Sequence, residues 1–231
     1  MNIINSYEKK FYSQNGEDGI IEEVFQRIGT TNKFFVEFGV YDGSQCNSAY
    51  LVLSKQWSGV WIEGNEIAYE NLCINFSNCP NVRTAHKFIT KANITRIFND
   101  MNVPLEFDLL SIDIDGNDYW VWRALSEYKP RLVVIEYNAH FPPPQKMVIM
   151  YNPKFHWDGT SYFGASLTSL YELGGKLGYS LLGTDKNGVN AFFLRKDLVD
   201  ISKFEELTPE SAYHPLIYGP YPDSNSPYLE I

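Results

Sequence analysis

Hydrophobic residues recur at helical spacing near the start of the chain. Ile20, Ile21 and Val24 share one face of a predicted helix over residues 13–27, and Gly29 follows as a stop. Short runs rich in strand-forming residues come next, at 34–38, 60–62, 82–89, 107–113 and 132–135. Segments with helical patterning separate these runs, at 46–56, 65–76, 94–101 and 118–128. Strands that alternate with helices in this way predict an α/β fold, with a parallel sheet and helices on both of its faces.

The regular alternation stops after Tyr137. Residues 141–162 hold several prolines and aromatic residues, a composition that predicts an ordered loop or lid. The tail from Leu207 is rich in proline, tyrosine and serine, and we expect it to wrap the surface or to be partly mobile.

Periodicity returns between these two segments. A helix is predicted at 166–177, followed by strands at 179–182 and 191–195. Residues 185–188, Asp-Lys-Asn-Gly, predict a hairpin turn between the two strands. A hairpin at the end of a parallel sheet makes the sheet mixed, with one antiparallel strand.

Composition and charge narrow the class of protein. The chain has 231 residues, 44% of them hydrophobic, which is enough for one sizeable core. A net charge of −9 disfavours nucleic-acid binding that depends on electrostatic attraction to the phosphates. The 3 cysteines form no C-x-x-C pair, which is typical of reduced thiols. The polar first residues and the lack of an apolar run of roughly 20 residues predict a cytoplasmic protein without a membrane span.

The first chemically informative segment follows the strand at 34–38. Glu37 lies in that strand, and Gly39 and Gly43 let the chain turn sharply and approach a ligand closely. The carboxyl ends of parallel strands are where such folds bind small molecules. Glu63 ends the next strand, where an acid can accept hydrogen bonds from the hydroxyls of an adenosine ribose. Together these residues predict a nucleoside site.

The spacing of the glycines distinguishes between cofactors. A dinucleotide site needs three glycines as G-x-G-x-x-G, to hold a pyrophosphate on a helix N-terminus. Here only Gly39 and Gly43 are present, and Glu37 and Asp42 would repel a pyrophosphate. Acids in these positions suit a ligand with a cationic amino-acid portion, such as S-adenosylmethionine. A nicotinamide cofactor is the second interpretation.

A further group of acids follows the strands at 107–113 and 132–135. By two-residue alternation Asp113 and Asp115 point to the same side, and Glu136 and Asn138 follow the neighbouring strand. One interpretation is a divalent cation held by Asp115 and Glu136, with Asp113 or Asn138 as further ligands. The other interpretation, which we favour, is that these side chains accept hydrogen bonds from the methyl donor and from the molecule that receives the methyl group, without a metal. Asp118 is expected to cap the next helix.

The candidates for a catalytic base are His140, His156 and Asp115. His140 follows the strand that ends near Tyr137, and His156 lies in the aromatic loop, so an imidazole could take a proton from an attacking hydroxyl. Trp157 and Tyr162 of the same loop are expected to bind the acceptor, as part of a lid over the crevice. Glu136 and Asn138 are expected to contribute to the same acceptor site.

Several motifs resemble those of FkbM-type methyltransferases. Tyr12 to Asp18, Y-S-Q-N-G-E-D, resembles the S-Q-x-G-E-D opening of that family, and residues 35–63 resemble its glycine-turn and G-W-x-G-x-x-I-E-P core. Residues 108–125 and 129–136 are similar to its K-I-D-V-E-G segment and following strand. The chain departs from the pattern in having Gly-Val-Tyr-Asp-Gly at 39–43, Ile-Glu-Gly at 62–64 and Ile-Asp-Gly at 114–116, which indicates a side branch.

The resemblance implies a Rossmann-like class I methyltransferase fold with a mixed seven-stranded sheet. It implies that Glu37 and Gly39 line the methionine part of S-adenosylmethionine, that Glu63 binds the ribose, and that Gln14 and Asn47 form the walls. With Asp42, Gly43 and Asp113, these residues make up the expected cofactor site. The implied activity is O-methylation of a sugar or of a nucleotide-activated precursor of a surface glycan, or of a phosphate-type oxygen.

On this interpretation residues 1–231 form a single methyltransferase domain. Residues 12–138 form the cofactor-binding half, 139–165 the acceptor loop, 166–200 the C-terminal part of the sheet and 205–231 the tail. The expected partner is a small-molecule acceptor, and a homo-oligomer is left open. The alternatives are a nicotinamide-dependent oxidoreductase and a non-catalytic nucleoside-binding module on the same fold.

Overall fold

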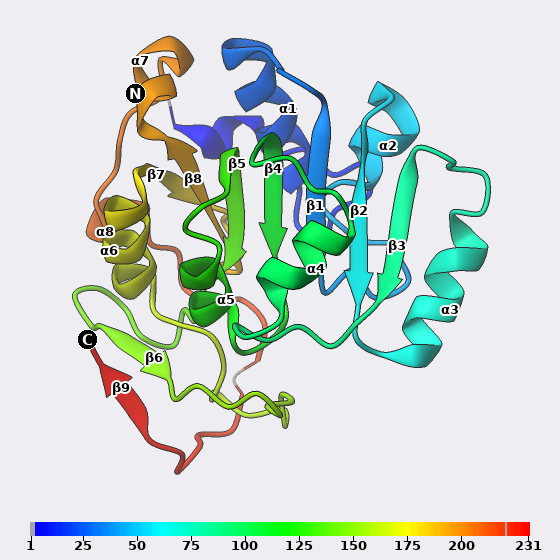
Figure 1. Ribbon diagram of the computed structural model, residues 1–231. Helices are drawn as coiled ribbons and strands as arrows, with labels where there is room; N and C mark the ends of the chain where they lie inside the picture. The colour runs from blue at the N-terminus through cyan, green and yellow to red at the C-terminus, as the bar shows by residue number, and fades with distance from the viewer. Residues whose placement is uncertain (1–2, 220) are drawn as a thin grey trace.

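A computed structural model describes residues 3–219 and 221–231, so Met1, Asn2 and Pro220 of the predicted domain lie outside the described residues. Its centre is a seven-stranded sheet in the order β3-β2-β1-β4-β5-β8-β7 (Figure 1). The strands are β1 (Phe34–Phe38), β2 (Ser58–Glu63), β3 (Val82–His86), β4 (Glu106–Ile112), β5 (Lys129–Glu136), β7 (Tyr179–Thr184) and β8 (Asn190–Arg195). Only β8 runs antiparallel to its neighbours, β5 and β7, which confirms the mixed α/β sheet.

Helices cover both faces of this sheet. They are α1 (Glu17–Ile28), α2 (Ala49–Lys55), α3 (Glu66–Asn75), α4 (Ile94–Asp100), α5 (Asp118–Ala124) and α6 (Leu167–Leu177). Side chains of α1, α2 and α3 form one buried cluster with one face of the strands, and side chains of α4, α5 and α6 form a second cluster with the other face. Because the central strands are buried on both faces, they consist of nearly continuous hydrophobic runs, as the sequence predicted.

The predicted helix ends agree with the structure where a side chain caps them. The Oδ1 atom of Asn65 accepts a hydrogen bond from the Ala68 amide at 3.0 Å, which begins α3 where expected. The prediction that α1 starts at residue 13 is wrong, because α1 begins at Glu17. The carboxylate of Asp18 accepts the amides of residues 11–13 instead, and this fixes the preceding segment as a loop.

The insertion and the tail pair with each other. The structure contains a second, two-stranded antiparallel sheet of β6 (Met147–Ile149) and β9 (Tyr228–Glu230), visible beside the C-terminus in Figure 1. The prediction of an irregular loop at 141–162 therefore missed the strand β6. The tail was expected to wrap the surface or to be partly mobile, but at β9 it is a paired strand. Three residues are too few to show an alternating pattern in the sequence, and their partner lies about eighty positions away.

Short helical segments complete the chain. They are η1 (Ile4–Tyr7), η2 (Lys196–Leu198), α7 (Val199–Ser202) and α8 (Pro209–Ala212). No helix in residues 3–219 or 221–231 combines the length and apolar character that a membrane span requires. The three cysteines, Cys46, Cys73 and Cys79, are free thiols.

The hairpin predicted at residues 185–188 is present and is held by its first residue. The fully buried carboxylate of Asp185 accepts hydrogen bonds from the amides of Asn187, Val189 and Asn190. Burial raises the pKa of Asp185 to about 7, with the nearby Glu17 carboxylate adding to the rise and the backbone amides opposing it. The turn therefore carries a carboxyl group that titrates near neutral pH.

This raised pKa predicts a pH-dependent stability. The folded protein keeps the Asp185 proton up to about pH 7, whereas the unfolded chain releases it near pH 4, so the folded state binds more protons between these values. The free energy of unfolding should thus fall as pH rises, with a contribution from this one group of up to about 1.4 kcal/mol per pH unit. Denaturant titrations of wild type and Asp185→Asn across this range should show the variant losing that part of the slope. Parallel curves would contradict the assignment.

Candidate active site

Three cavities meet at the carboxyl ends of the parallel strands. The β1 cavity, about 330 Å³, follows β1 and is lined by residues that include Gln14, Glu17, Asp42 and Asn47. The β2 cavity, about 510 Å³, follows β2 and includes Glu63, Asn65, Phe155 and His156 in its lining. The aromatic cavity, about 250 Å³, includes Glu136, Trp157, Phe163, Tyr218 and Tyr221. Asp113 lines all three, so it lies at the junction of one branched crevice.

Gly39 allows the chain to leave β1 into this crevice. Its φ of +75° is in the left-handed region, and a Cβ atom built on it would lie 1.4 Å from the carbonyl oxygen of Asp113. Gly43 also has a positive φ, but a Cβ there would meet Phe76 at 2.4 Å. Gly43 therefore serves close packing against the segment after α3, whereas Gly39 lines both the β1 and the β2 cavity.

Glu37 lines the β1 cavity and holds one of its loops in place. Its side chain is only 4% exposed, and its carboxylate accepts the amides of Asn47 and Ser48 at 2.7 and 2.9 Å and the Ser111 hydroxyl at 3.2 Å. Burial raises the pKa of Glu37, and these hydrogen bonds oppose the rise. Glu37 thus lines the β1 cavity while its oxygens hold the loop that carries Asn47, and its contact with a cofactor stays a prediction.

The remaining expected residues of the β1 cavity lie on its wall. Asp42 accepts hydrogen bonds from the Ser44 amide and hydroxyl, at 3.0 and 2.6 Å, and these bonds lower the pKa of Asp42. Gln14 and Asn47 line the same cavity, as does Glu17, which the sequence analysis did not single out. The wall combines acidic side chains with amide and hydroxyl groups, which suits a ligand that carries both an ammonium and a carboxylate group.

Glu63 joins the loops that follow β1 and β2. Its Oε2 atom accepts the Tyr41 amide and its Oε1 atom accepts the Asn65 amide, both at 2.7 Å. The side chain is 8% exposed and borders the β2 cavity. Each carboxylate oxygen has a second lone pair, so Glu63 can also accept a hydrogen bond from a hydroxyl in that cavity.

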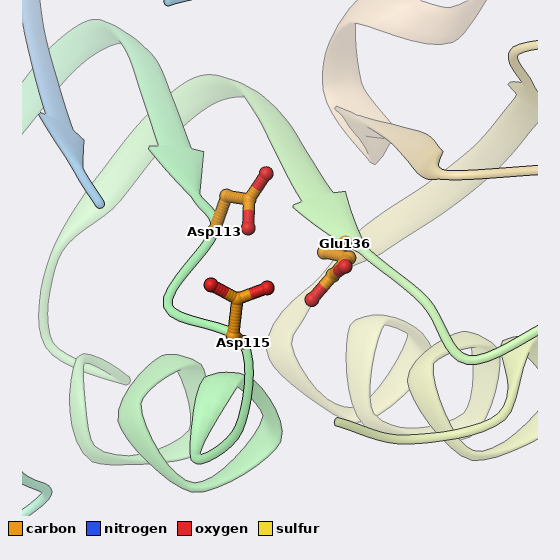
Figure 2. A group of neighbouring side chains, drawn as sticks. All are labelled: Asp113, Asp115 and Glu136. Carbon is orange, nitrogen blue, oxygen red and sulfur yellow. The ribbon is translucent and has the colours of Figure 1, made fainter. Parts of the chain in front are cut away.

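Asp113, Asp115 and Glu136 form an acidic cluster at the junction of the cavities. Figure 2 shows their carboxylates turned towards one another, from the loop after β4 and the end of β5. One oxygen from each lies within 4.8 Å of the others. Burial and the neighbouring acids raise the pKa values of Asp113 and Glu136 well above their ordinary range. The enclosing crevice, together with Glu63, also raises the pKa of Asp115.

The route by which Asp113 and Asp115 come together differs from the predicted strand alternation. β4 ends at Ile112, and Asp115 has a φ of +51°, so both acids lie in a loop. Asp118 holds this loop by accepting the Ile114 amide at 2.9 Å and the Gly116 amide at 2.8 Å. The prediction that Asp118 caps the following helix is therefore wrong: Asn117 is the N-cap residue, and Asp118 is the first residue of α5.

The structure does not bring the three catalytic candidates together. Asp115 lines the aromatic and β2 cavities, and His156 lines the β2 cavity, with its ring centroid 4.7 Å from that of Phe88. His140 lies behind the aromatic cavity, with its ring centroid 5.7 Å from that of Tyr221. Within the described part of the chain, His140 lines none of the three cavities. Burial lowers the pKa of His140, which disfavours its cationic form.

Two of the expected acceptor-binding residues have structural partners instead. Asn138 is fully buried, donating to the carbonyls of Ser161 and Phe163 at 2.8 Å and accepting from the His140 amide and ring. Tyr162 donates its hydroxyl proton to the Pro227 carbonyl at 3.0 Å and accepts the Met150 amide. In the described part of the chain neither side chain lines one of the three cavities, and their polar groups fix the insertion and the tail, so acceptor binding by these two residues stays a prediction. Trp157 and Glu136 do line the aromatic cavity.

The tail supplies part of the aromatic cavity. Leu216, Tyr218 and Tyr221 line it together with Trp157 and Phe163 of the insertion. The rings of Trp157 and Tyr221 meet edge to face, with centroids 5.1 Å apart. Sequence reasoning missed these tail residues, although the tyrosine enrichment of the tail was a usable signal. A tail that was expected to lie on the surface thus closes a site.

Comparisons with known proteins support this architecture. No model of a known protein family matches the sequence, and no curated protein matches it either. The resemblance to FkbM-type methyltransferases therefore stays a prediction from the motifs. Similar solved structures do exist.

The N-terminal domain of EvdMO1 with SAH bound has a TM-score of 0.50 and 11% identity, over 79% of this chain and 80% of that one. The CurJ carbon methyltransferase has a TM-score of 0.51 and 6% identity, over 80% of this chain and 56% of that one. The CMeT domain of the citrinin polyketide synthase also has a TM-score of 0.51, with 9% identity, over 78% of this chain and 51% of that one. At these identities the likeness concerns the fold. This chain has the Rossmann-like fold of S-adenosylmethionine-dependent methyltransferases.

Proposed function

We propose that this protein is an S-adenosylmethionine-dependent methyltransferase that methylates a hydroxyl oxygen of a small polar acceptor, of the saccharide or nucleotide-activated saccharide class. The observation that carries the proposal is the meeting of three chemically different cavities at Asp113. A methyl donor with two dissimilar halves and an acceptor need three such subsites around one point. The fold shared with structures of known methyltransferases supports the same proposal.

The donor would occupy two of the cavities. The adenosine would lie in the β2 cavity, where Glu63 accepts a hydrogen bond from the ribose and Phe155 and His156 border the base. The methionine portion would lie in the β1 cavity, with its ammonium group near the acids Glu17 and Asp42. These acids would repel the pyrophosphate of a dinucleotide, which argues against the nicotinamide alternative.

The acceptor would occupy the aromatic cavity. Its walls combine aromatic rings, which contact the apolar face of a sugar, with carboxylates, which accept hydrogen bonds from hydroxyl groups. In the reaction the acceptor oxygen attacks the methyl carbon, the carbon–sulfur bond breaks, and S-adenosylhomocysteine leaves. Because the sulfonium is already activated, the main work of the protein is alignment of the two reactants.

The test of the proposal is methyl transfer from radiolabelled S-adenosylmethionine to a panel of free and nucleotide-linked sugars. Trp157 lines the acceptor cavity and not the donor cavities, so Trp157→Ala should raise the acceptor KM by about tenfold while donor affinity stays within about twofold. Phe141→Ala is the matched control, because Phe141 packs on Tyr228 away from the three cavities. It should leave the acceptor KM unchanged.

Two results would count against this assignment. If Trp157→Ala weakens donor binding and leaves the acceptor KM unchanged, the two subsites have been exchanged. If the wild-type protein binds S-adenosylmethionine but methylates no hydroxyl-bearing acceptor and instead methylates carbon or nitrogen nucleophiles, O-methylation is the wrong chemistry.

A further inference from the structure

The acidic cluster, which is partly exposed, differs in its hydrogen bonding from the buried acids of the described chain. Protein groups donate to the carboxylates of Glu37, Asp108, Asp118 and Asp185 at short distance. In residues 3–219 and 221–231, no protein donor lies within hydrogen-bond distance of the side-chain oxygens of Asp113, Asp115 or Glu136. One oxygen from each of the three carboxylates lies within 4.8 Å of the others, and none of them has a partner from the described residues.

Among the described residues, Glu136 is the acid of the cluster that has a buried oxygen without a hydrogen-bond partner. Its Oε2 atom is buried, and in the described part of the chain it has no hydrogen-bond partner. Figure 2 shows the Glu136 carboxylate directed at the other two acids. A buried carboxylate oxygen without a partner is costly, and proteins retain such a group where something outside the chain completes it.

Positive charge from the protein does not reach the cluster either. Among the described residues no lysine, arginine or histidine forms an ion pair with these three acids, whereas Asp108 at the opposite end of β4 pairs with Arg131 at 3.0 Å. Carboxylates that face one another without a protein cation beside them repel one another, and a multiply charged cation would relieve that repulsion.

We propose that Asp113, Asp115 and Glu136 bind one divalent cation of the Mg²⁺ or Mn²⁺ class. The three ligands are carboxylates, the donor type that hard cations prefer. Asp113 and Asp115 come from the loop after β4 and Glu136 from the end of β5, and one oxygen of each lies within 4.8 Å of the others. The absence of sulfur or imidazole ligands in the set disfavours zinc. A single ammonium group would offset only one of the three charges. This reverses the sequence-based preference for a site without a metal.

Cation binding itself does not depend on the proposed methyl transfer. A role for the cation in the reaction does rest on that proposed function. Asp115 and Glu136 line the aromatic cavity, so the cation would contact an acceptor placed there. It would favour the ionised form of an acceptor hydroxyl, with the proton released to water. Since His140 lies behind the wall of that cavity, this is a route to an activated hydroxyl without an imidazole base. The acceptor class narrows to molecules that offer an oxygen ligand, such as sugars with adjacent hydroxyl groups.

The experiment is a Mn²⁺ titration of the full chain after treatment with EDTA, followed by electron paramagnetic resonance of free Mn²⁺. Wild type should bind one Mn²⁺ per chain, and Glu136→Gln should weaken binding by about 10- to 100-fold. Asp158→Asn is the matched control, because Asp158 is an exposed acid of the insertion that bonds to Thr160 in its own turn. It should bind Mn²⁺ as wild type does.

Thermal unfolding separates loss of a ligand from loss of the fold. Without Mn²⁺, Glu136→Gln should unfold at no lower temperature than wild type, because a neutral amide replaces an unpartnered carboxylate. Mn²⁺ should raise the unfolding temperature of wild type and not that of the variant. No bound Mn²⁺ at about 1 mM free metal, or equal binding by Glu136→Gln, would overturn the proposal. Mn²⁺ binding without binding of S-adenosylhomocysteine would support the cation site and contradict the proposed function.

Discussion

Gly39→Ala should abolish donor binding and destabilise the protein. An alanine at this position must keep a φ of +75°, and its Cβ would overlap the carbonyl oxygen of Asp113. Because the obstacle is backbone, relief requires the loop that carries the acidic cluster to move. We expect the affinity for S-adenosylhomocysteine to fall by at least about 100-fold, and the free energy of unfolding to fall by about 3 kcal/mol. Calorimetric titration and denaturant unfolding measure the two effects.

Gly175→Ala is the control for this substitution. Gly175 lies in α6, and no heavy atom lies within 4 Å of the position its Cβ would take. Alanine is favoured over glycine in a helix by about 1 kcal/mol, so this variant should be at least as stable as wild type and bind the ligand normally. If Gly39→Ala behaves like Gly175→Ala, the close approach of the β1 turn to Asp113 is not what shapes the site.

Glu37→Ala should have the second large effect. It removes the acceptor of the Asn47 and Ser48 amides and leaves both donors buried without a partner. The expected loss in the free energy of unfolding is about 3 kcal/mol, and the β1 cavity should lose its wall at Asn47. Donor affinity should fall by more than about tenfold even at temperatures where the variant is folded. Far-ultraviolet circular dichroism and calorimetric titration would follow both changes.

The matched control is Glu127→Ala, since Glu127 is exposed and lies just before the amino end of β5, whereas the crevice lies at the carboxyl ends of the strands. Its stability should stay within about 0.5 kcal/mol of wild type. Glu37→Gln, which keeps the size and one acceptor oxygen, should lie between wild type and Glu37→Ala. Unchanged ligand affinity in Glu37→Ala would mean that the loop carrying Asn47 holds its shape without the carboxylate.

The central strands were predictable because each is a short hydrophobic run between turn residues. β1 spans Phe34–Phe38 as predicted, and β5 extends the predicted run at both ends. Such runs depend on local composition, which a single sequence displays. The pairing of β6 with β9 was not predictable, because it depends on contacts between segments far apart in the chain.

The residue types at the site were easier to predict than their roles. The turn after β1 and the acids after β4 and β5 do line the crevice, since strand ends converge at one edge of a parallel sheet. Asn138 illustrates the limit: its position after β5 is right, but all its bonding capacity is directed at its own loop. Whether a polar side chain faces ligand or backbone depends on neighbours that the sequence does not place.

His140 and Tyr221 show that closeness to a strand end in sequence does not decide which side chains line the crevice. His140 follows β5 closely in sequence and still lies behind the aromatic wall, while Tyr221, more than eighty residues later, forms that wall. Sequence distance from a strand end therefore predicts which loops border a crevice, but not which side chains reach it. The insertion and the tail fold over each other, and that arrangement decides the acceptor site.

The most direct test of the account is calorimetric titration of the wild-type protein with S-adenosylhomocysteine, with NAD as the competing ligand. We expect one site per chain with a dissociation constant in the range of about 1 to 100 µM, a binding free energy of roughly 5 to 8 kcal/mol, and no heat with NAD. No binding at millimolar S-adenosylhomocysteine, or binding of NAD in its place, would contradict it.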